Sequence, residues 1–320
     1  MNSMARPRIL YIAGYGRSGS TVLDIVLGSH PSAVGLGEVT YLFEEAVLDR
    51  KCACGKPFRE CSLWHGALAE VGDPRRAAKT IRVVERRLFL PWLVLGRGLF
   101  LPRRRYAAIQ GALLAHVRRV CGAPVLVDSS KTARGAAGRA LALAWFLAED
   151  VRVIHLVRDA REVLRSLVAT GSNWALEGRA SPPRLPAFRA MSGWLLSNLS
   201  AAFLGRLLGR RRYLRLRFHD LLDDPEAVLT RICEWAGLDT AGIREAASKR
   251  GPFRAGHQVG GNRLRAQREI HIRKPNGDAD SLAGLPVRAR IAYHLFASLL
   301  NRHYGFPARA DGGLSWERGS

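Results

Sequence analysis

The sequence predicts an α/β fold in which a mainly parallel central sheet is covered by helices on both faces, a P-loop-like three-layer arrangement. Short apolar segments at about 8–14, 124–128, 151–157 and 213–217 are expected as strands, and they alternate with long helical patterns. The first segment leads through a Gly/Ser-rich turn into a helix. The chain has 320 residues and is 48% hydrophobic, which is enough to bury a large core.

We expect one domain over residues 1–320, with a helical, cysteine-containing insertion at about 40–120. A covering segment is expected at about 239–282, where glycine, arginine and polar residues show little periodicity. Ligands of parallel sheets bind at the carboxyl ends of the strands. Gly14, Asp128 and Arg158 stand at such ends, so the functional site is expected there.

The turn after the first strand, Gly14-Tyr15-Gly16-Arg17-Ser18-Gly19-Ser20-Thr21, predicts a phosphate-binding loop. Glycines let the backbone approach an anion, and the N–H groups at the helix start converge on it. The spacing nearly matches the Walker A motif, but Ser20 stands at the lysine position and the cation is Arg17. The missing lysine favours a phosphorylated ligand other than a nucleoside triphosphate. A bare glycine-rich turn is the alternative.

A second pattern joins the strand at 151–157 to a helix expected to begin near Ala160. Arg158 stands at the strand end, and Ser166 follows eight residues later, less than two turns into the helix. A guanidinium and a hydroxyl so placed can share one anion. The alternative is an arginine that caps the sheet edge and a serine that faces solvent.

The segment 213–238 predicts a strand, an acidic turn and a helix. Asp224 is the expected N-cap of this helix, Pro225 its first residue, and Gly237 follows its last apolar residue.

In this order, these elements resemble the sulfotransferases that use 3′-phosphoadenosine 5′-phosphosulfate (PAPS), of the bacterial type with a P-loop-like fold. The arginine ahead of Ser-Gly-Ser-Thr resembles their 5′-phosphosulfate loop, and the arginine and serine spaced by eight resemble their 3′-phosphate site. Residues 256–265 resemble the Gly-rich segment that folds over the nucleotide, with a flexible basic loop as the alternative. The resemblance implies as nucleotide-binding residues Arg17, Ser18, Gly19, Ser20, Thr21, Arg158, Ser166, Gly261 and Arg265, the last favoured over Arg263.

Sulfuryl transfer needs a base for the acceptor and cations for the charge that grows on the leaving group. Arg17 is the candidate for the charge on the phosphosulfate oxygens. Glu38 stands where several bacterial and glycan-acting relatives carry a catalytic glutamate, with Glu44 and Glu45 as fallback candidates. The alternative for Glu38 is a helix N-terminal glutamate stabilised by the dipole. Some relatives carry a lysine in the loop that holds Lys131, which makes it a candidate to assist the leaving group.

The resemblance therefore implies a PAPS-dependent sulfotransferase (EC 2.8.2 type) with the 3′,5′-bisphosphate (PAP) as product and no metal requirement. The acceptor would be a hydroxyl, or less favourably an amine, of a small molecule, carbohydrate or lipid. Asp128 follows four apolar residues, as in a Walker B strand, so a P-loop nucleotide-dependent kinase with magnesium is one alternative. A non-catalytic phosphoanion-binding protein is another.

The formal net charge of +23 favours an anionic acceptor or surface, but the arginines are spread along the chain and we expect no nucleic-acid partner. The apolar segment 88–101 has arginines on both sides. It is interpreted either as a peripheral membrane contact or as a buried helix pair. Without a secretory signal or a run of about 18 apolar residues, a cytoplasmic location is expected. The sequence indicates neither the acceptor nor the oligomeric state.

Three of the five cysteines, Cys52, Cys54 and Cys61, stand close to His65. Three sulfurs and an imidazole can form a tetrahedral zinc site, although the CxC spacing is tighter than the usual CxxC. A local disulfide and free thiols are the alternatives, and similar cysteine segments occur in bacterial relatives without a known metal requirement. We assign no metal ligand from the sequence.

Overall fold

The computed structural model describes residues 8–89, 96, 101–132, 136–169, 185–261, 263–267, 269–273, 282 and 284–306. The chain divides into two compact units. Unit 1 comprises residues 1–157 and 197–274, and unit 2 comprises residues 158–196 and 275–320. The expectation of a single domain stays a prediction.

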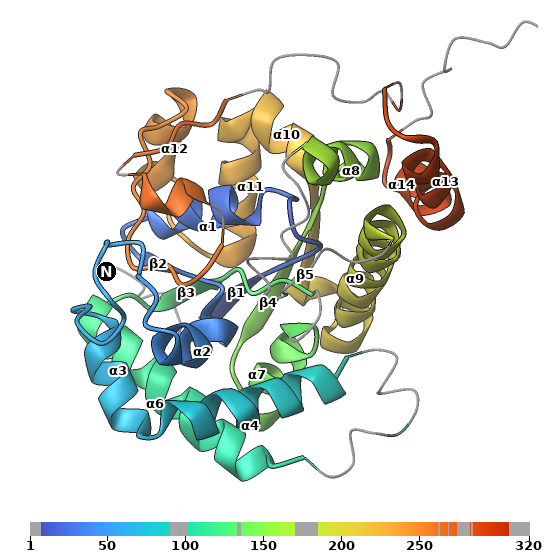
Figure 1. The fold of residues 1–320 in the computed structure, drawn as a ribbon. Helices are drawn as coiled ribbons and strands as arrows, with labels where there is room; N and C mark the ends of the chain where they lie inside the picture. Colours follow the sequence, from blue (N-terminus) through green and yellow to red (C-terminus); the bar gives the residue numbers. More distant parts are fainter. Residues whose placement is uncertain are drawn as a thin grey trace, which may run out of the picture. The chain divides into compact units, whose positions relative to one another are not determined.

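Unit 1 is built on a parallel sheet of five strands in the order β2-β3-β1-β4-β5 (Figure 1). The strands are β1 (Arg8–Ala13), β2 (Ala33–Gly37), β3 (Val125–Asp128), β4 (Val151–Val157) and β5 (Tyr213–Arg217). The α/β class with a parallel sheet is therefore confirmed, as are the four expected strands. The edge strand β2 is an addition that the sequence pattern did not predict.

Alternating residues of the central strand β1 separate two hydrophobic cores. Ile9 and Tyr11 belong to one core, and Leu10 and Ile12 belong to the other. Successive side chains of a strand point to opposite faces of the sheet. A continuous apolar strand is therefore what a parallel sheet covered on both faces requires.

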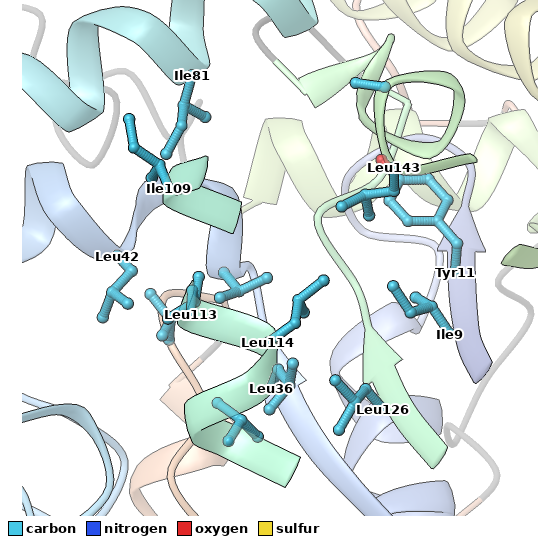
Figure 2. Close-up of a cluster of buried hydrophobic side chains, with 14 of the residues drawn as sticks. Ile9, Tyr11, Leu36, Leu42, Ile81, Ile109, Leu113, Leu114, Leu126 and Leu143 are labelled. Carbon is cyan, nitrogen blue, oxygen red and sulfur yellow. The ribbon is translucent and has the colours of Figure 1, made fainter. Parts of the chain in front are cut away.

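The first core packs helices of the segment between β2 and β4 against the sheet (Figure 2). These are η1 (Val39–Tyr41), α2 (Leu42–Val47), α3 (Trp64–Val71), α4 (Pro74–Arg87), α6 (Arg103–Cys121) and α7 (Arg139–Phe146). The second core holds α1 (Ser20–Gly28), α10 (Phe218–Asp223), α11 (Pro225–Ala236) and α12 (Ala241–Ser248). The sheet between these two groups of helices forms the expected three layers.

Capping residues explain where α11 begins and ends. The Asp224 carboxylate accepts a hydrogen bond from the backbone N–H of Ala227 at 3.0 Å, Pro225 is the first helical residue, and Gly237 closes the helix with a φ of 64°. A proline at the first position needs no N–H partner, and a glycine adopts this left-handed conformation without steric cost. The three predicted positions are confirmed.

Unit 2 contains α8 (Ala160–Ala169), the first part of α9 (Pro186–Leu208), α13 (Val287–Phe296) and α14 (Ser298–His303). The start of α8 is fixed by Asn301, whose side chain accepts from the N–H of Ala160 at 2.9 Å and donates to the Asp159 carboxylate at 3.1 Å. Two short 3₁₀ helices of unit 1, η3 (Arg210–Arg212) and η4 (Arg263–Ala266), complete the elements.

Two sequence expectations concern membranes. Among the described residues, no helix has the length and apolar content that crossing a bilayer would take. Most of the apolar segment 88–101 lies outside the described residues, so its contact with a lipid surface stays a prediction.

Candidate functional site

Two of the three glycines in the turn between β1 and α1 adopt backbone conformations that other residues rarely reach. Gly14 has a φ of 133°, and a Cβ there would collide with the carbonyl oxygen of Leu156 in β4. Gly19 is the N-cap of α1 with a φ of 88°, and a Cβ there would enter the ring of Phe218. The helix begins at Ser20. The predicted strand, glycine turn and helix are thus present in the structure.

The same turn carries features that fit an anionic ligand. Arg17 has a φ of 70°, a left-handed conformation that costs a residue with a side chain about 1 kcal/mol or more. Ser18 is buried, and its hydroxyl finds no hydrogen-bond partner among the described residues. Such a hydroxyl is expensive to bury unless a ligand completes its hydrogen bonds. With the first N–H groups of α1 nearby in sequence, the residues fit a phosphate or sulfate group.

Glu38 and Lys131 meet beside this turn. Glu38 follows β2 and Lys131 follows β3, and the lysine ammonium forms an ion pair with the Glu38 carboxylate. Both side chains are largely buried, with 18% and 13% of their surfaces exposed. Lys131 is held in a left-handed conformation, with a φ of 69°, and its carbonyl oxygen accepts from the buried Tyr11 hydroxyl. Two of the three predicted catalytic residues are therefore in contact.

Gly261 connects the pair to the glycine turn. A Cβ at Gly261 would lie 3.2 Å from the Thr21 hydroxyl oxygen and 3.8 Å from a carboxylate oxygen of Glu38. The predicted residues Thr21, Glu38, Lys131 and Gly261 thus lie together, although they come from four separate segments.

Residues 257–261 of the covering segment run along the sheet edge at β2. The N–H of Val259 donates to the Leu36 carbonyl at 2.8 Å, and the N–H of Glu38 donates to the Val259 carbonyl at 2.6 Å. Gly37 has a φ of 72°, and a Cβ there would collide with the Val259 backbone. The segment is therefore held directly against the backbone of the candidate base.

Arg265 stabilises this segment in the structure. Its guanidinium donates to the carbonyl oxygens of Lys51 at 3.2 Å and Gln258 at 3.3 Å. Its predicted contact with a nucleotide stays a prediction, as does the preference over Arg263.

A buried ionic cluster that the sequence analysis missed lies under the loop that carries Lys131. Arg139 is fully buried and donates to Asp128 at 2.6 Å, to Glu85 at 2.7 Å and to Gln110 at 3.1 Å. Burial raises the pKa of Glu85, and the charge of Arg139 opposes that rise. The Ser130 hydroxyl, two residues from Asp128, accepts from the N–H of Thr40 at 3.2 Å. The cluster therefore fixes the segments that follow both Glu38 and Asp128.

Asp24 is a second buried acid that the sequence analysis missed. It lies on α1, inside an apolar helical pattern that gives no sign of its environment. Its carboxylate accepts from the N–H of Gly37 at 3.0 Å, next to Glu38. Burial raises the pKa of Asp24 to about 7, against the lowering effect of hydrogen bonds from Ser129, Gly37 and Gln258.

Arg158 and Ser166 belong to unit 2 and are described within it. Arg158 directly follows β4, and its Nε donates to the Glu162 carboxylate at 2.6 Å. The indole N–H of Trp194 donates to the Arg158 carbonyl at 3.3 Å. Ser166 is half-buried in α8, which begins at Ala160 as expected. Their joint binding of one phosphate stays a prediction.

The cysteine cluster has a different histidine from the one expected. The sulfurs of Cys52, Cys54 and Cys61 and a ring nitrogen of His257 lie within 4.8 Å of one another. His65 is not part of this group, because it stands on the exposed side of the first turn of α3, next to the buried Trp64. The sequence offered His65 as one possible partner of these cysteines, and the structure places His257 beside them instead. His257 could not be found from spacing, since it is almost 200 residues away in the chain.

Comparison with known proteins finds a family model that matches the middle of the chain. The profile of the Sulfotransferase family matches residues 100–242, which confirms the predicted resemblance over that range. This range includes Lys131, Arg158 and Ser166, and it leaves out the glycine turn and Glu38. None of the curated proteins matches the chain significantly.

Several solved structures of sulfotransferases are also similar to the chain. The sulfotransferase domain of a Synechococcus olefin synthase is 25% identical, with 73% of this chain and 74% of that domain covered and a TM-score of 0.42. The sulfotransferase domain of the curacin biosynthetic pathway is 20% identical, with 90% and 97% covered and a TM-score of 0.48. A sulfotransferase from Mycobacterium avium is 17% identical, with 78% and 70% covered and a TM-score of 0.43.

Proposed function

We propose that this chain, whose residues 100–242 match the Sulfotransferase family, transfers the sulfuryl group of PAPS to an acceptor hydroxyl. The observation that carries the proposal is the meeting of Glu38 and Lys131 beside the glycine turn, where the buried Ser18 hydroxyl has no partner among the described residues. An anion-binding turn next to a carboxylate and an ammonium group supplies what sulfuryl transfer needs.

The nucleotide would be bound by two groups of residues. Arg17, Ser18, Gly19, Ser20 and Thr21 would hold the 5′-phosphosulfate through backbone N–H groups, hydroxyls and one guanidinium. Arg158 and Ser166 would hold the 3′-phosphate, as the resemblance implies. Gly261 and Arg265 would belong to the segment that covers the nucleotide, and PAP would be the product.

In the proposed reaction the acceptor oxygen forms a bond to sulfur, and the bond from sulfur to the 5′-phosphate oxygen breaks. The electron pair of the broken bond leaves with PAP, and the acceptor proton goes to the Glu38 carboxylate. Arg17 and Lys131 would stabilise the charge that develops on the transferred group and on the leaving oxygen. Lys131 would also orient Glu38, because the two side chains form an ion pair.

The acceptor would be a hydroxyl of a small molecule, a carbohydrate or a lipid, with an amine as the less favoured group. The glycine turn and the Glu38–Lys131 pair bear on the donor and on the proton transfer.

The kinase alternative loses support from the contacts of Asp128. Both of its carboxylate oxygens are engaged, one by the Arg139 guanidinium at 2.6 Å and the other by the N–H of Ser130 at 3.0 Å. A Walker B aspartate needs its carboxylate for magnesium. The turn also has Ser20 where a kinase of this type has its lysine.

The test is a screen for acceptors that gain the mass of a sulfuryl group when they are incubated with the protein and PAPS. With a hit in hand, Glu38→Gln should lower turnover at least about 100-fold and leave PAP affinity unchanged, because it removes a base and no nucleotide contact. Glu226→Gln on α11 is the matched control, since Glu226 is an exposed carboxylate that pairs with Arg244 at 3.1 Å and has no proposed role in the reaction.

Calorimetry with PAP tests the donor site separately from turnover. Arg158→Ala should weaken PAP binding by about 2 kcal/mol, or about 30-fold, because it removes a charge-assisted contact. Near-normal turnover of Glu38→Gln would move the base role to another residue. Failure of the wild-type protein to bind PAP would refute the proposed donor and leave a non-catalytic anion-binding role with a different ligand.

A further inference from the structure

Four side chains of types that can bind a metal ion lie close together in unit 1. Cys52, Cys54 and Cys61 come from the segment between α2 and α3, and His257 comes from the covering segment. The four side chains include two buried cysteines, one exposed cysteine and a half-buried histidine.

The distances among these groups match those of a tetrahedral zinc site. With Zn–S bonds of about 2.3 Å and a Zn–N bond of about 2.0 Å, two sulfurs lie about 3.8 Å apart, and a sulfur lies about 3.5 Å from the nitrogen. The sulfurs of Cys54 and Cys61 are 3.8 Å apart. The Nδ1 of His257 lies 3.9 Å from the Cys52 sulfur and 3.1 Å from the Cys61 sulfur, on either side of the expected value.

The same distances argue against a disulfide as the native arrangement. A disulfide bond is about 2.05 Å long, and all three cysteines are free in the structure. A disulfide between any two of them would leave the third thiol and the imidazole without a common function. A metal ion would use all four groups at once.

We propose that Cys52, Cys54, Cys61 and His257 bind one zinc ion at a structural site. Three thiolates and one imidazole form one of the usual donor sets of structural zinc, and four protein ligands leave no open position for substrate. Soft thiolate donors favour zinc over magnesium or calcium. The site would therefore stabilise the fold and take no part in the chemistry.

The contacts around His257 indicate what the metal would hold in place. The indole N–H of Trp64 donates to the His257 carbonyl at 2.6 Å, and the N–H of Ala53 donates to the Gln258 carbonyl at 3.2 Å. Two residues further on, Val259 forms the backbone hydrogen bonds to Leu36 and Glu38. A metal ion at the cluster would therefore fix the covering segment against the candidate base.

A metal link between these segments would also close a very long loop. Cys61 and His257 are separated by 196 positions in the chain. The entropic cost of closing a loop rises with the length of the loop. A metal link between distant residues therefore restricts the unfolded chain more than a link between neighbouring residues does. Zinc removal should loosen residues 257–261 first, because only a few backbone hydrogen bonds would then hold them against β2.

The first experiment measures the metal content of the untagged, full-length protein by inductively coupled plasma mass spectrometry. One zinc per chain is expected, and cobalt(II) exchanged into the site should show the visible bands of tetrahedral thiolate coordination. Zinc-free protein that also gives no such cobalt spectrum would overturn the proposal. An intact mass that shows a disulfide between two of the three cysteines would overturn it too, and a different stoichiometric metal would correct the choice of zinc.

Variants test the ligand set. Cys54→Ser and His257→Ala should each weaken zinc binding more than about a hundredfold, because each removes one of four ligands. Cys121→Ser and His65→Ala are the matched controls, since both residues are exposed and stand outside the cluster. Full zinc binding by His257→Ala would overturn the ligand assignment.

Hydrogen exchange covers the case in which the ligand variants fail to fold. Zinc removal from the wild-type protein should speed exchange at the Val259 N–H, which donates to Leu36 at 2.8 Å. Exchange that is identical with and without zinc would refute the link between the metal and the covering segment. PAP binding is read separately, so a failure of the zinc proposal leaves the proposed function standing.

Discussion

Replacement of Asp24 by asparagine should change how the stability of this protein depends on pH. The carboxyl of Asp24 is fully buried, and burial raises its pKa from 3.8 to about 7. At 1.36 kcal/mol per pKa unit, this difference corresponds to about 4 kcal/mol. A raised carboxyl pKa means that the folded state binds the proton more tightly than the unfolded state. The stabilisation is therefore fully present below pH 3.8 and is lost as the pH rises through 7.

Asparagine keeps an oxygen that can accept the hydrogen bond from the Gly37 N–H, and it has no proton to lose as the pH rises. We therefore expect the free energy of unfolding of Asp24→Asn to rise relative to wild type as the pH increases, by about 2.5 kcal/mol between pH 5 and pH 8. Urea unfolding at several pH values measures this difference. Asp73→Asn is the control, since it makes the same change at the exposed N-cap of α4 and leaves the buried Asp24 in place. Parallel curves for wild type and Asp24→Asn would refute the reasoning.

Two helical glycines should respond to alanine with opposite signs in the same urea assay. Gly66→Ala on α3 should destabilise the protein by about 1–3 kcal/mol, because the new methyl group would collide with the His116 ring, which Leu63 and Glu70 hold in place. Gly111→Ala on α6 should stabilise it by about 0.5–1 kcal/mol, because the site is open and alanine restricts the unfolded chain. Changes of the same sign in the free energy of unfolding of both variants would contradict this interpretation of the two sites.

The sheet was predictable because four of its strands are short segments with an apolar or alternating pattern and clear boundaries. The strand β1, for example, is buried at every position from Arg8 to Ala13, and an apolar run of this length indicates a strand covered on both faces. The edge strand β2 has the sequence Ala-Val-Gly-Leu-Gly, which is short, rich in glycine and without alternation. Its pairing with β3 is a tertiary effect that local pattern does not encode.

The candidate site was predictable where a motif is local and hidden where partners are distant. The glycine turn and the start of α8 each lie within one short stretch of sequence. Arg139 stands in a helix whose neighbours are mostly apolar, and its burial between two carboxylates depends on residues that are 11 and 54 positions away. His257 is further still from its cysteines. Spacing therefore led to His65, the imidazole closest in sequence.

The Arg139 cluster offers the most direct test of how the site is held in place. Arg139→Met removes the guanidinium that pairs with both Asp128 and Glu85, and both carboxylates are buried. Breaking a buried ion pair from one side costs about 3–5 kcal/mol, because a buried charge is left uncompensated. Arg118→Met is the matched control, since Arg118 pairs with the partly exposed Glu149 and its removal should cost about 1 kcal/mol or less.

Two measurements distinguish uncompensated charge from lost packing as the cause of the stability loss in Arg139→Met. If uncompensated charge is responsible, the cost of Arg139→Met should shrink at low pH, because burial raises the pKa of Glu85 and its carboxyl then takes up a proton. Adding Asp128→Asn and Glu85→Gln should recover part of the loss at neutral pH, because all three charges are then absent. A cost that equals that of Arg118→Met and does not change with pH would show that the cluster does not stabilise the loops of Glu38 and Lys131 through charge.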